Sequence, residues 1–409
     1  MPDFGGSDLD AFRAQMRDWL EANFPASLRR DASAVTDAEA TGARLDGDAA
    51  LWKQRMGEAG LGTPTWPKAY GGAGLSRAEA RVLAEEMAAI GAPNPIGGMG
   101  VIMFGPTLLE YGNEEQLRTH LPPIIKGDLR WCQGFSEPGA GSDLAGLQTK
   151  AVDMGDHYLV SGQKIWTSGA HLADWCFCLV RTDPSKKHEG ISFLLIDMKS
   201  PGVEARPILL INGTTPFCET FFTDVKVPKE NLMGPLNGGW TIAKRLLQHE
   251  RQGISGAGQL TPGAQAGSIP GPALDELARD YVGLDDDGRL ADPDLRTRLT
   301  RHLMEAQAFQ LTGMRAAAET RSNSGPSAVS SVLKNVGSQV RQERAELAVE
   351  ILGAQGLGWA GEAFSPDELA TIRAMLRSKS GTIAGGSQEI QNNIISKRIL
   401  GLPEVTQAR

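Results

Sequence analysis

Cysteine, histidine and long apolar runs are scarce in this sequence of 409 residues, and each scarcity excludes a class of protein. The four cysteines form no CxxC pair and fall mostly in apolar runs, so we expect buried free thiols rather than disulfides. The six histidines are scattered without ligand spacing, which predicts that no metal is bound. The cysteines are Cys132, Cys176, Cys178 and Cys218.

No run approaches the roughly 20 apolar residues that a membrane span needs, so we expect no transmembrane helix. The acidic beginning, MPDFGGSDLD, lacks the basic and apolar regions of a signal peptide, which predicts a cytoplasmic protein. Positive charge is also in deficit, with a formal net charge of −8. This argues against a general nucleic-acid binder, because neutralising phosphates requires clustered Lys and Arg.

The composition that is present, 41% hydrophobic and 22% charged, is typical of a globular protein with two or three domains. Residues 1–130 read as an all-helical domain. Ser76 with Glu79 forms a capping box that opens a helix through Ile90, and Asn113 caps another. An amphipathic helix is expected over residues 8–24, with a core face formed by Leu9, Phe12, Met16, Trp19, Leu20 and Phe24.

Residues 131–238 are rich in β-branched and aromatic residues between turn signals, which predicts a β domain. We expect antiparallel hairpins, because no crossover helix fits between the strands and no GxGxxG motif joins a strand to a helix. The expected strands are 158–166, 174–182, 190–198 and 219–227.

Residues 239–409 return to long amphipathic helices with short connections, as in an antiparallel four-helix bundle. The Gly/Ala/Pro-rich stretch 255–272 between the first two cannot be continuous helix. The expected helices are 240–255, 295–319, 328–353 and 367–381.

The stretch WCQGFSEPGAGSD, residues 131–143, has the composition of a binding loop. Pro138, Gly139 and Gly141 rule out a regular helix, and small residues let the backbone approach a flat or anionic ligand closely. Ser136 and Ser142 add hydroxyl donors without charge. The same residues would also suit a surface turn with no ligand.

The expected strand 158–166, which runs into GQKIWTSGA (162–170), delivers an indole and two hydroxyls, from Trp166, Thr167 and Ser168, to its end. There they could meet a planar cofactor. The alternative is a hairpin that uses Gly and Ser for turn chemistry alone.

SEPGAGSD followed by GQKIWTSGA resembles the flavin-binding signature of the acyl-CoA dehydrogenase family. The resemblance covers nearly the whole chain and weakens between about 256 and 294. It implies an α+β architecture with an N-terminal helical domain, a middle antiparallel β domain and a C-terminal four-helix bundle. Further matching stretches are WPKAYGGAGLS (66–76), LPPIIKGDLRWC (121–132), DVKVP (224–228) and SQEIQNNIISKRILG (387–401).

The resemblance implies an FAD-dependent enzyme of fatty acid or lipid catabolism. It would oxidise an acyl-CoA thioester to the trans-2-enoyl-CoA and pass electrons to an electron-transfer flavoprotein. A homo-oligomer, dimer or homotetramer, is implied, and a heteromer stays open. Two alternatives are kept: an acyl-CoA oxidase or flavin monooxygenase of the same fold, and a non-catalytic subunit of a heteromeric dehydrogenase.

The family takes its catalytic base from one of two places, and the resemblance implies the helix-borne version here. Gly385 stands at the loop position, so no carboxylate is available there, whereas HER at 249–251 places Glu250 at the helix position. Glu250 follows Leu246 and Leu247 at helical spacing, which directs it toward the packed side. The alternative is that Glu250 is an exposed helix glutamate paired with a neighbouring Arg and has no catalytic role. Glu137 and Glu389 are other candidate bases.

The family's remaining roles transfer to residues that match its motifs. Those that resemble flavin or thioester contacts are Gln133, Ser136, Gly141, Ser142, Trp166 and Ser168, of which Ser142 also borders substrate. Arg251 resembles a residue that positions the CoA side of the ligand. Ser387 resembles a contact to the ribityl or adenylate portion of FAD, and it would equally serve as a helix N-cap.

The sequence departs from the family at one cofactor-anchoring site. The family's RxxFG motif, whose Arg reaches the FAD pyrophosphate of a neighbouring subunit, is replaced by the Gly/Pro-rich stretch, and Glu350 stands where Gln is frequent. FAD would then be anchored differently, bind more weakly, or depend on a sister subunit. The same stretch follows Glu250 closely, which suggests a bulky, branched or ring-bearing acyl group.

Overall fold

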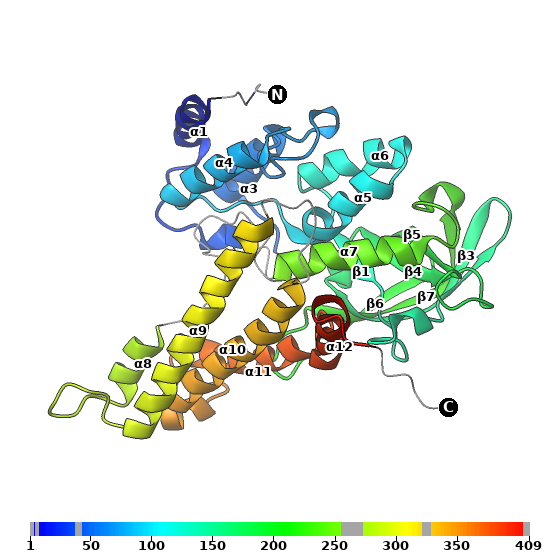
Figure 1. The fold of residues 1–409 in the computed structure, drawn as a ribbon. Coiled ribbons are helices and arrows are strands. Elements are labelled where there is room, and N and C mark those ends of the chain that lie inside the picture. Colours follow the sequence, from blue (N-terminus) through cyan, green and yellow to red (C-terminus); the bar gives the residue numbers. More distant parts are fainter. Residues whose placement is uncertain (1–3, 5–7, 37–42, 255–272, 321–328, 404–409) are drawn as a thin grey trace, which may run out of the picture. The chain divides into compact units, whose positions relative to one another are not determined.

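The computed structural model describes residues 4, 8–36, 43–254, 273–320 and 329–403, and the side chains of 250–254 and 317–320 lie outside the description (Figure 1). The chain divides into two compact units. The described part of the first comprises residues up to 208 together with 215–250, and that of the second comprises 209–214 and the residues from 251 on.

The first unit begins with helices, and its described residues before Trp131 contain no strand, as predicted. Capping boxes at Ser76 with Glu79 and at Asn113 with Gln116 are confirmed. Leu9 was wrongly assigned to the core, because it lies in the first turn and is 41% exposed. These helices are α1 (Leu9–Asn23), α3 (Gly47–Glu58), α4 (Arg77–Ala89), α5 (Gly105–Tyr111, after a π-helical turn at Gly100–Phe104) and α6 (Glu114–Ile125).

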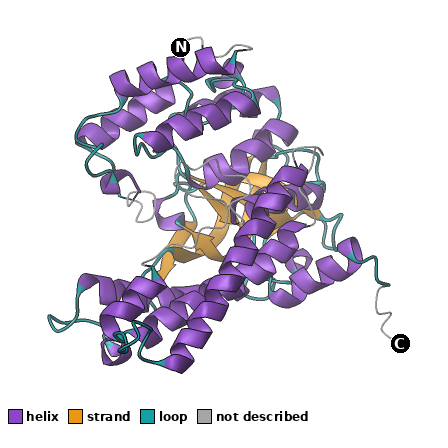
Figure 2. Cartoon of the chain, turned by 60° about the vertical axis from the view of Figure 1, so that its left-hand side comes forward, coloured by secondary structure: helices purple, strands orange, loops and turns teal. Residues whose placement is uncertain are grey.

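The β domain is one seven-stranded sheet in the order β1-β4-β2-β3-β7-β6, with β5 paired to β4. The strands are orange in Figure 2. The expected antiparallel pairing is confirmed for β2/β3, β3/β7, β4/β5 and β6/β7, while β1 and β2 each pair parallel with β4, which was not predicted. The strands are β1 (Trp131–Gly134), β2 (Lys150–Asp153), β3 (His157–Ser168), β4 (Trp175–Arg181), β5 (Ile191–Asp197), β6 (Val203–Ile208) and β7 (Phe217–Pro228).

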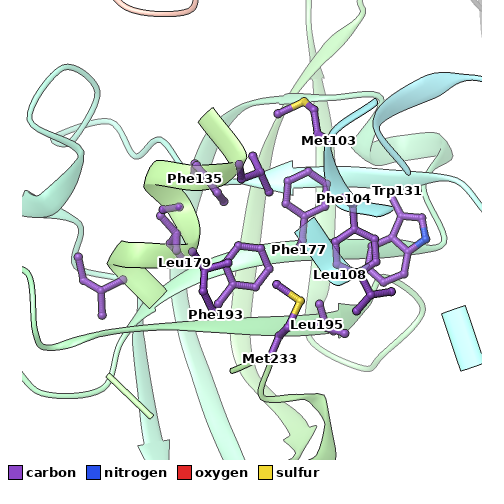
Figure 3. Close-up of a cluster of buried hydrophobic side chains, with 14 of the residues drawn as sticks. Met103, Phe104, Leu108, Trp131, Phe135, Phe177, Leu179, Phe193, Leu195 and Met233 are labelled. Atoms are coloured by element: carbon purple, nitrogen blue, oxygen red, sulfur yellow. The ribbon is translucent and has the colours of Figure 1, made fainter. Parts of the chain in front are cut away.

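Stacked aromatic rings join the N-terminal helices to one face of this sheet (Figure 3). Phe104 stacks on Trp131 with ring centroids 3.9 Å apart, and on Phe177 at 5.5 Å. On the other face the four cysteines are buried free thiols, as predicted. Burial raises the pKa of Cys178, so this thiol stays protonated near neutral pH.

Helix α7 (Gly239–Ile254) packs through Ile242, Ala243 and Leu246 into the same aromatic core. Its first residue lies against strand β5: a Cβ added to Gly239 would sit 2.5 Å from the Ser192 carbonyl carbon. Only glycine allows this approach, so the residue at position 239 determines where α7 starts on the sheet. Among the described residues, no helix is long and apolar enough to cross a membrane.

The second unit is helical in its described part, and the helices expected there are confirmed. Its core contains Leu274, Leu295, Leu299, Leu347 and Ile351. A short helix before α9 was not predicted, whereas the short helix after α11 is the one that Ser387 was expected to cap. The helices are α8 (Leu274–Tyr281), α9 (Pro293–Thr320), α10 (Val329–Ile351), α11 (Pro366–Ser378) and α12 (Gln388–Ile394).

The contact at Gly239 predicts that Gly239→Ala destabilises the protein by about 1–3 kcal/mol, because the added methyl overlaps strand backbone. Gly313→Ala is the matched control, since a Cβ there meets no atom within 4 Å in the middle of α9. Alanine in a helix interior should leave stability unchanged or raise it by about 0.5–1 kcal/mol. Thermal unfolding of both variants measures the difference, and equal midpoints would contradict the close approach.

His120 is buried edge-on between Trp131 and Trp175, and burial lowers its pKa to about 4. The unfolded chain therefore binds the proton more readily, and stability present above about pH 6.5 is lost as the pH falls toward 4. His120→Phe removes this titration, so between pH 7 and 4 the variant should lose about 3 kcal/mol less than wild type. Denaturant unfolding at both pH values tests this, and parallel losses would disprove it.

Candidate active site

The turn after β1 is closed by two backbone hydrogen bonds between Glu137 and Ala140, each 3.0 Å long. Ala140 is buried beneath it, while Pro138 and Gly139 are exposed. A Cβ added at Gly139 or Gly141 would meet no atom within 4 Å. The turn therefore presents open backbone that a ligand can approach.

The end of β3 lies beside this turn, because the Ser136 carbonyl accepts a hydrogen bond of 2.9 Å from the Ile165 amide. A β-bulge between Lys164 and Thr167 gives Trp166 a φ of 61°. This left-handed conformation is strained for a bulky residue. The indole is 53% exposed and touches the Phe217 ring edge-on at 6.1 Å, so the strained bulge displays a flat aromatic face.

Four polar side chains on β1, on the turn and at the end of β3 have no hydrogen-bond partner in the part of the chain that the structure describes. Among the described residues, none forms a hydrogen bond with the side chains of Gln133, Ser136, Ser142 or Ser168. Hydroxyl and amide donors beside an open glycine turn and an exposed indole fit the ring carbonyls and nitrogens of a flavin. The structure thus brings together the predicted contacts on the turn and on β3; their roles stay predictions.

A buried ion pair lies next to the turn and includes one of its residues, Glu137. Glu137 and Lys164 lie 2.8 Å apart, with side chains 8% and 0% exposed. The Glu137 carboxylate also accepts hydrogen bonds from the amides of Gln148 and Thr149, at 2.6 and 2.8 Å. The Lys164 ammonium also donates to the Phe135 carbonyl at 3.1 Å. Each charge is therefore compensated by the other and by backbone groups.

Glu137 is unsuited to be the catalytic base. Burial raises its pKa, but the charge of Lys164 and hydrogen bonds from Lys164, Thr149 and Gln148 outweigh this effect and lower the pKa overall. A carboxylate so stabilised is a weak proton acceptor. The structure instead shows Glu137 ordering the turn.

Helix α7 carries the predicted base, Glu250. The helical turn just before Glu250 contacts helix α5. The Glu110 carboxylate accepts from Arg245 Nε at 2.7 Å and lies 3.3 Å from His249 Nε2. Burial and the charge of Arg245 lower the pKa of His249 against the opposing effect of Glu110. The backbone is helical at Glu250 and Arg251, but their side chains lie outside the described residues. Their predicted roles stay predictions.

The second unit holds the remaining candidates. Gly385 has a φ of 67°, a conformation that disfavours a side chain at this position. Ser387 caps α12 by accepting from the Ile390 amide, which confirms the N-cap interpretation, while its contact to FAD is untested. Glu389 is exposed in the first turn of α12. Glu350 pairs with Arg298 at 2.6 Å, and this guanidinium lowers its pKa.

Lys164 was not singled out from the sequence, although a signal was present. Tyr158, Val160 and Lys164 share the parity of one strand face, and all three are buried. A lysine in phase with buried residues predicts an inward-facing cation that requires a partner. The partner, Glu137, comes from a separate turn, so periodicity within β3 could not identify it.

Comparison with known proteins gives consistent results across the chain. Models of the N-terminal, middle and C-terminal domains of acyl-CoA dehydrogenases match residues 7–128, 132–225 and 237–400. Acyl-CoA dehydrogenase IpdE1 of Mycobacterium tuberculosis is 38% identical, over 97% of this chain and 98% of the relative.

Solved structures agree. The structure named "Tcur3481-Tcur3483 steroid ACAD" is 30% identical with a TM-score of 0.73, over 99% of this chain and 100% of that chain. The ChsE4-ChsE5 complex from Mycobacterium tuberculosis is 30% identical with a TM-score of 0.70, over the same shares. This chain therefore belongs to the acyl-CoA dehydrogenase family, whose members are FAD-dependent oxidoreductases acting on CH–CH groups.

Proposed function

We propose that this chain oxidises an acyl-CoA thioester to the trans-2-enoyl-CoA, with FAD held at the glycine turn and the end of β3. The observation that supports this most directly is the set of polar side chains on the turn and on β1 and β3 without a hydrogen-bond partner among the described residues, together with the exposed Trp166 indole. FAD would supply the acceptor for the hydride that leaves the substrate β-carbon. The side chains that would hold it are those of Gln133, Ser136, Ser142, Trp166 and Ser168, with open backbone at Gly141.

Within this proposal, Glu250 removes the α-proton of the thioester. Its helix is held by two kinds of contact: Ala243 and Leu246 are buried in the core, and Arg245 is anchored to Glu110. A carboxylate carried one turn later, and partly desolvated by substrate, would have its pKa raised toward neutrality, as a base acting near pH 7 needs. Arg251 would position the CoA side of the ligand, and Ser387 would contact the distal part of FAD.

We further propose a ring-bearing acyl group as the substrate. The support is a solved structure named "steroid ACAD", which matches nearly the full length of the chain. The stretch 255–272, which suggested a bulky acyl group from the sequence, lies outside the described residues. For the acceptor we propose an electron-transfer flavoprotein, since a relative named caffeyl-CoA reductase-Etf complex subunit CarC is 32% identical over 82% of this chain.

Assembly with a second type of subunit is also part of the proposal. Two similar solved structures carry paired names, Tcur3481-Tcur3483 and ChsE4-ChsE5. The missing RxxFG motif favours the same arrangement, because a sister chain could supply the pyrophosphate contact; a homo-oligomer is the alternative. We also propose domain boundaries after residues 130 and 238. A cytoplasmic location is proposed, to which four free buried thiols are suited.

Glu250→Gln should reduce the rate of dehydrogenation by about 10²–10⁴-fold while leaving bound FAD in place, because the amide cannot accept the α-proton. Anaerobic addition of a ring-bearing acyl-CoA should bleach the visible flavin bands of wild type rapidly and those of the variant slowly. Glu389→Gln is the matched control and should behave as wild type.

Bleaching of the Glu250→Gln protein at the wild-type rate would exclude Glu250 as the base. A faster reaction with straight short-chain acyl-CoA than with ring-bearing substrate would reject the substrate proposal. Rapid oxygen consumption by the substrate-reduced enzyme would favour the oxidase alternative over transfer to an electron-transfer flavoprotein.

A further inference from the structure

The segment Ala145–Thr149, which follows the glycine turn, is held by two buried charges of opposite sign. Its amides at Gln148 and Thr149 donate to the Glu137 carboxylate. Its carbonyls at Ala145 and Leu147 accept from Arg181 Nη2, at 2.6 and 3.1 Å. A carboxylate therefore binds the donors of this irregular segment while a guanidinium binds its acceptors.

Arg181 also forms hydrogen bonds with a second loop. Its Nη1 donates to the carbonyls of Lys186 and Lys187, both at 2.7 Å, and its side chain is buried. Burial lowers the pKa of Arg181, against the favourable charge of Glu137. One guanidinium thus fixes two separate loops to strand β4.

The position of Lys164 connects this network to the glycine turn. Lys164 lies two residues before Trp166 on β3, and its ammonium contacts both Glu137 and the Phe135 carbonyl, which flank Ser136. Because the Phe135 carbonyl and the Glu137 carboxylate, on either side of Ser136, are bonded to one buried cation, the turn is tied to the strand that carries the exposed indole. Buried ion pairs often contribute little net stability, and in some proteins they select one arrangement of the segments that they join.

We propose that Lys164 is a positioning residue for FAD, which acts through Glu137 to hold the turn Ser136–Ser142 and the end of β3 in a single ligand-binding arrangement. This inference rests on the proposed function, because it takes the turn and the indole as the flavin contacts. Lys164 itself has no exposed atom with which to touch the cofactor. Its effect on FAD is therefore exerted through the backbone that it anchors.

The test compares Lys164→Met with wild type, because methionine keeps much of the apolar stem and removes the ammonium. FAD is removed from the purified proteins, and its rebinding is titrated by flavin fluorescence at a temperature where both are folded. Hydrogen exchange at the Gln148 and Thr149 amides is measured in the FAD-free proteins. Lys199→Met is the matched control, since it removes an exposed ion pair with Asp174 in the same sheet region.

We expect Lys164→Met to weaken FAD binding at least tenfold and to accelerate exchange at both amides, with no change in either for Lys199→Met. Unchanged affinity and exchange in folded Lys164→Met would overturn the inference, even if its unfolding midpoint were lower. Should Lys164→Met fail to fold, Glu137→Gln gives the same two readouts with a smaller perturbation. Wild type that binds no FAD would instead contradict the proposed function, a result distinguishable from loss of binding in the variant alone.

Discussion

The buried contact between Lys164 and Glu137 is the interaction on which the candidate site depends. Placing either charge alone in this interior would cost several kcal/mol. Together they are compensated by each other and by the Phe135 carbonyl and the Gln148 and Thr149 amides. The consequence is a glycine turn without regular secondary structure whose backbone is nevertheless held in one conformation.

The exposed surface above this pair carries features that a stable fold would not require. Trp166 has a left-handed φ and leaves over half of its indole in solvent, although an aromatic ring is usually stabilising when buried. The turn that is bonded to this strand through Ser136 has open backbone at Gly139 and Gly141 and serine hydroxyls without a hydrogen-bond partner within the described ranges. Strain and exposure that coincide at one location are typical of ligand sites. Members of the family are FAD-dependent, and for this reason we propose a flavin as the ligand of this surface.

Local chemistry made much of the fold predictable. Capping boxes at Ser76 and Asn113 and the long amphipathic helices follow from neighbouring residues, so they could be found without tertiary information. Strands β1, β2 and β6 were missed, the first two because four residues are too few to show alternation. The parallel pairing of β1 and β2 with β4 depends on contacts distant in sequence, which no local pattern encodes. Leu9 was misplaced because helical spacing alone does not show where the first turn leaves the core.

The site was predictable only in part, for the same reason. The residue types of the turn and of β3 indicated a planar or anionic ligand, and the resemblance to the family implied that it is a flavin. The support of these segments by Lys164 and Arg181 arises from folding. The spacing of Lys164 from the buried residues of its strand indicated that its side chain points inward. Arg181 lies in an apolar run, and its hydrogen bonds go to carbonyls of other segments, so no sequence pattern indicated its role. Glu250 came from the resemblance to the family.

Hydrogen exchange of the FAD-free and FAD-loaded protein tests the central claim most directly, namely that the turn and the end of β3 together form the flavin site. We expect FAD to slow exchange at the amides of residues 137, 139–142 and 166–168. Protection confined to other segments, with these amides unchanged, would contradict it.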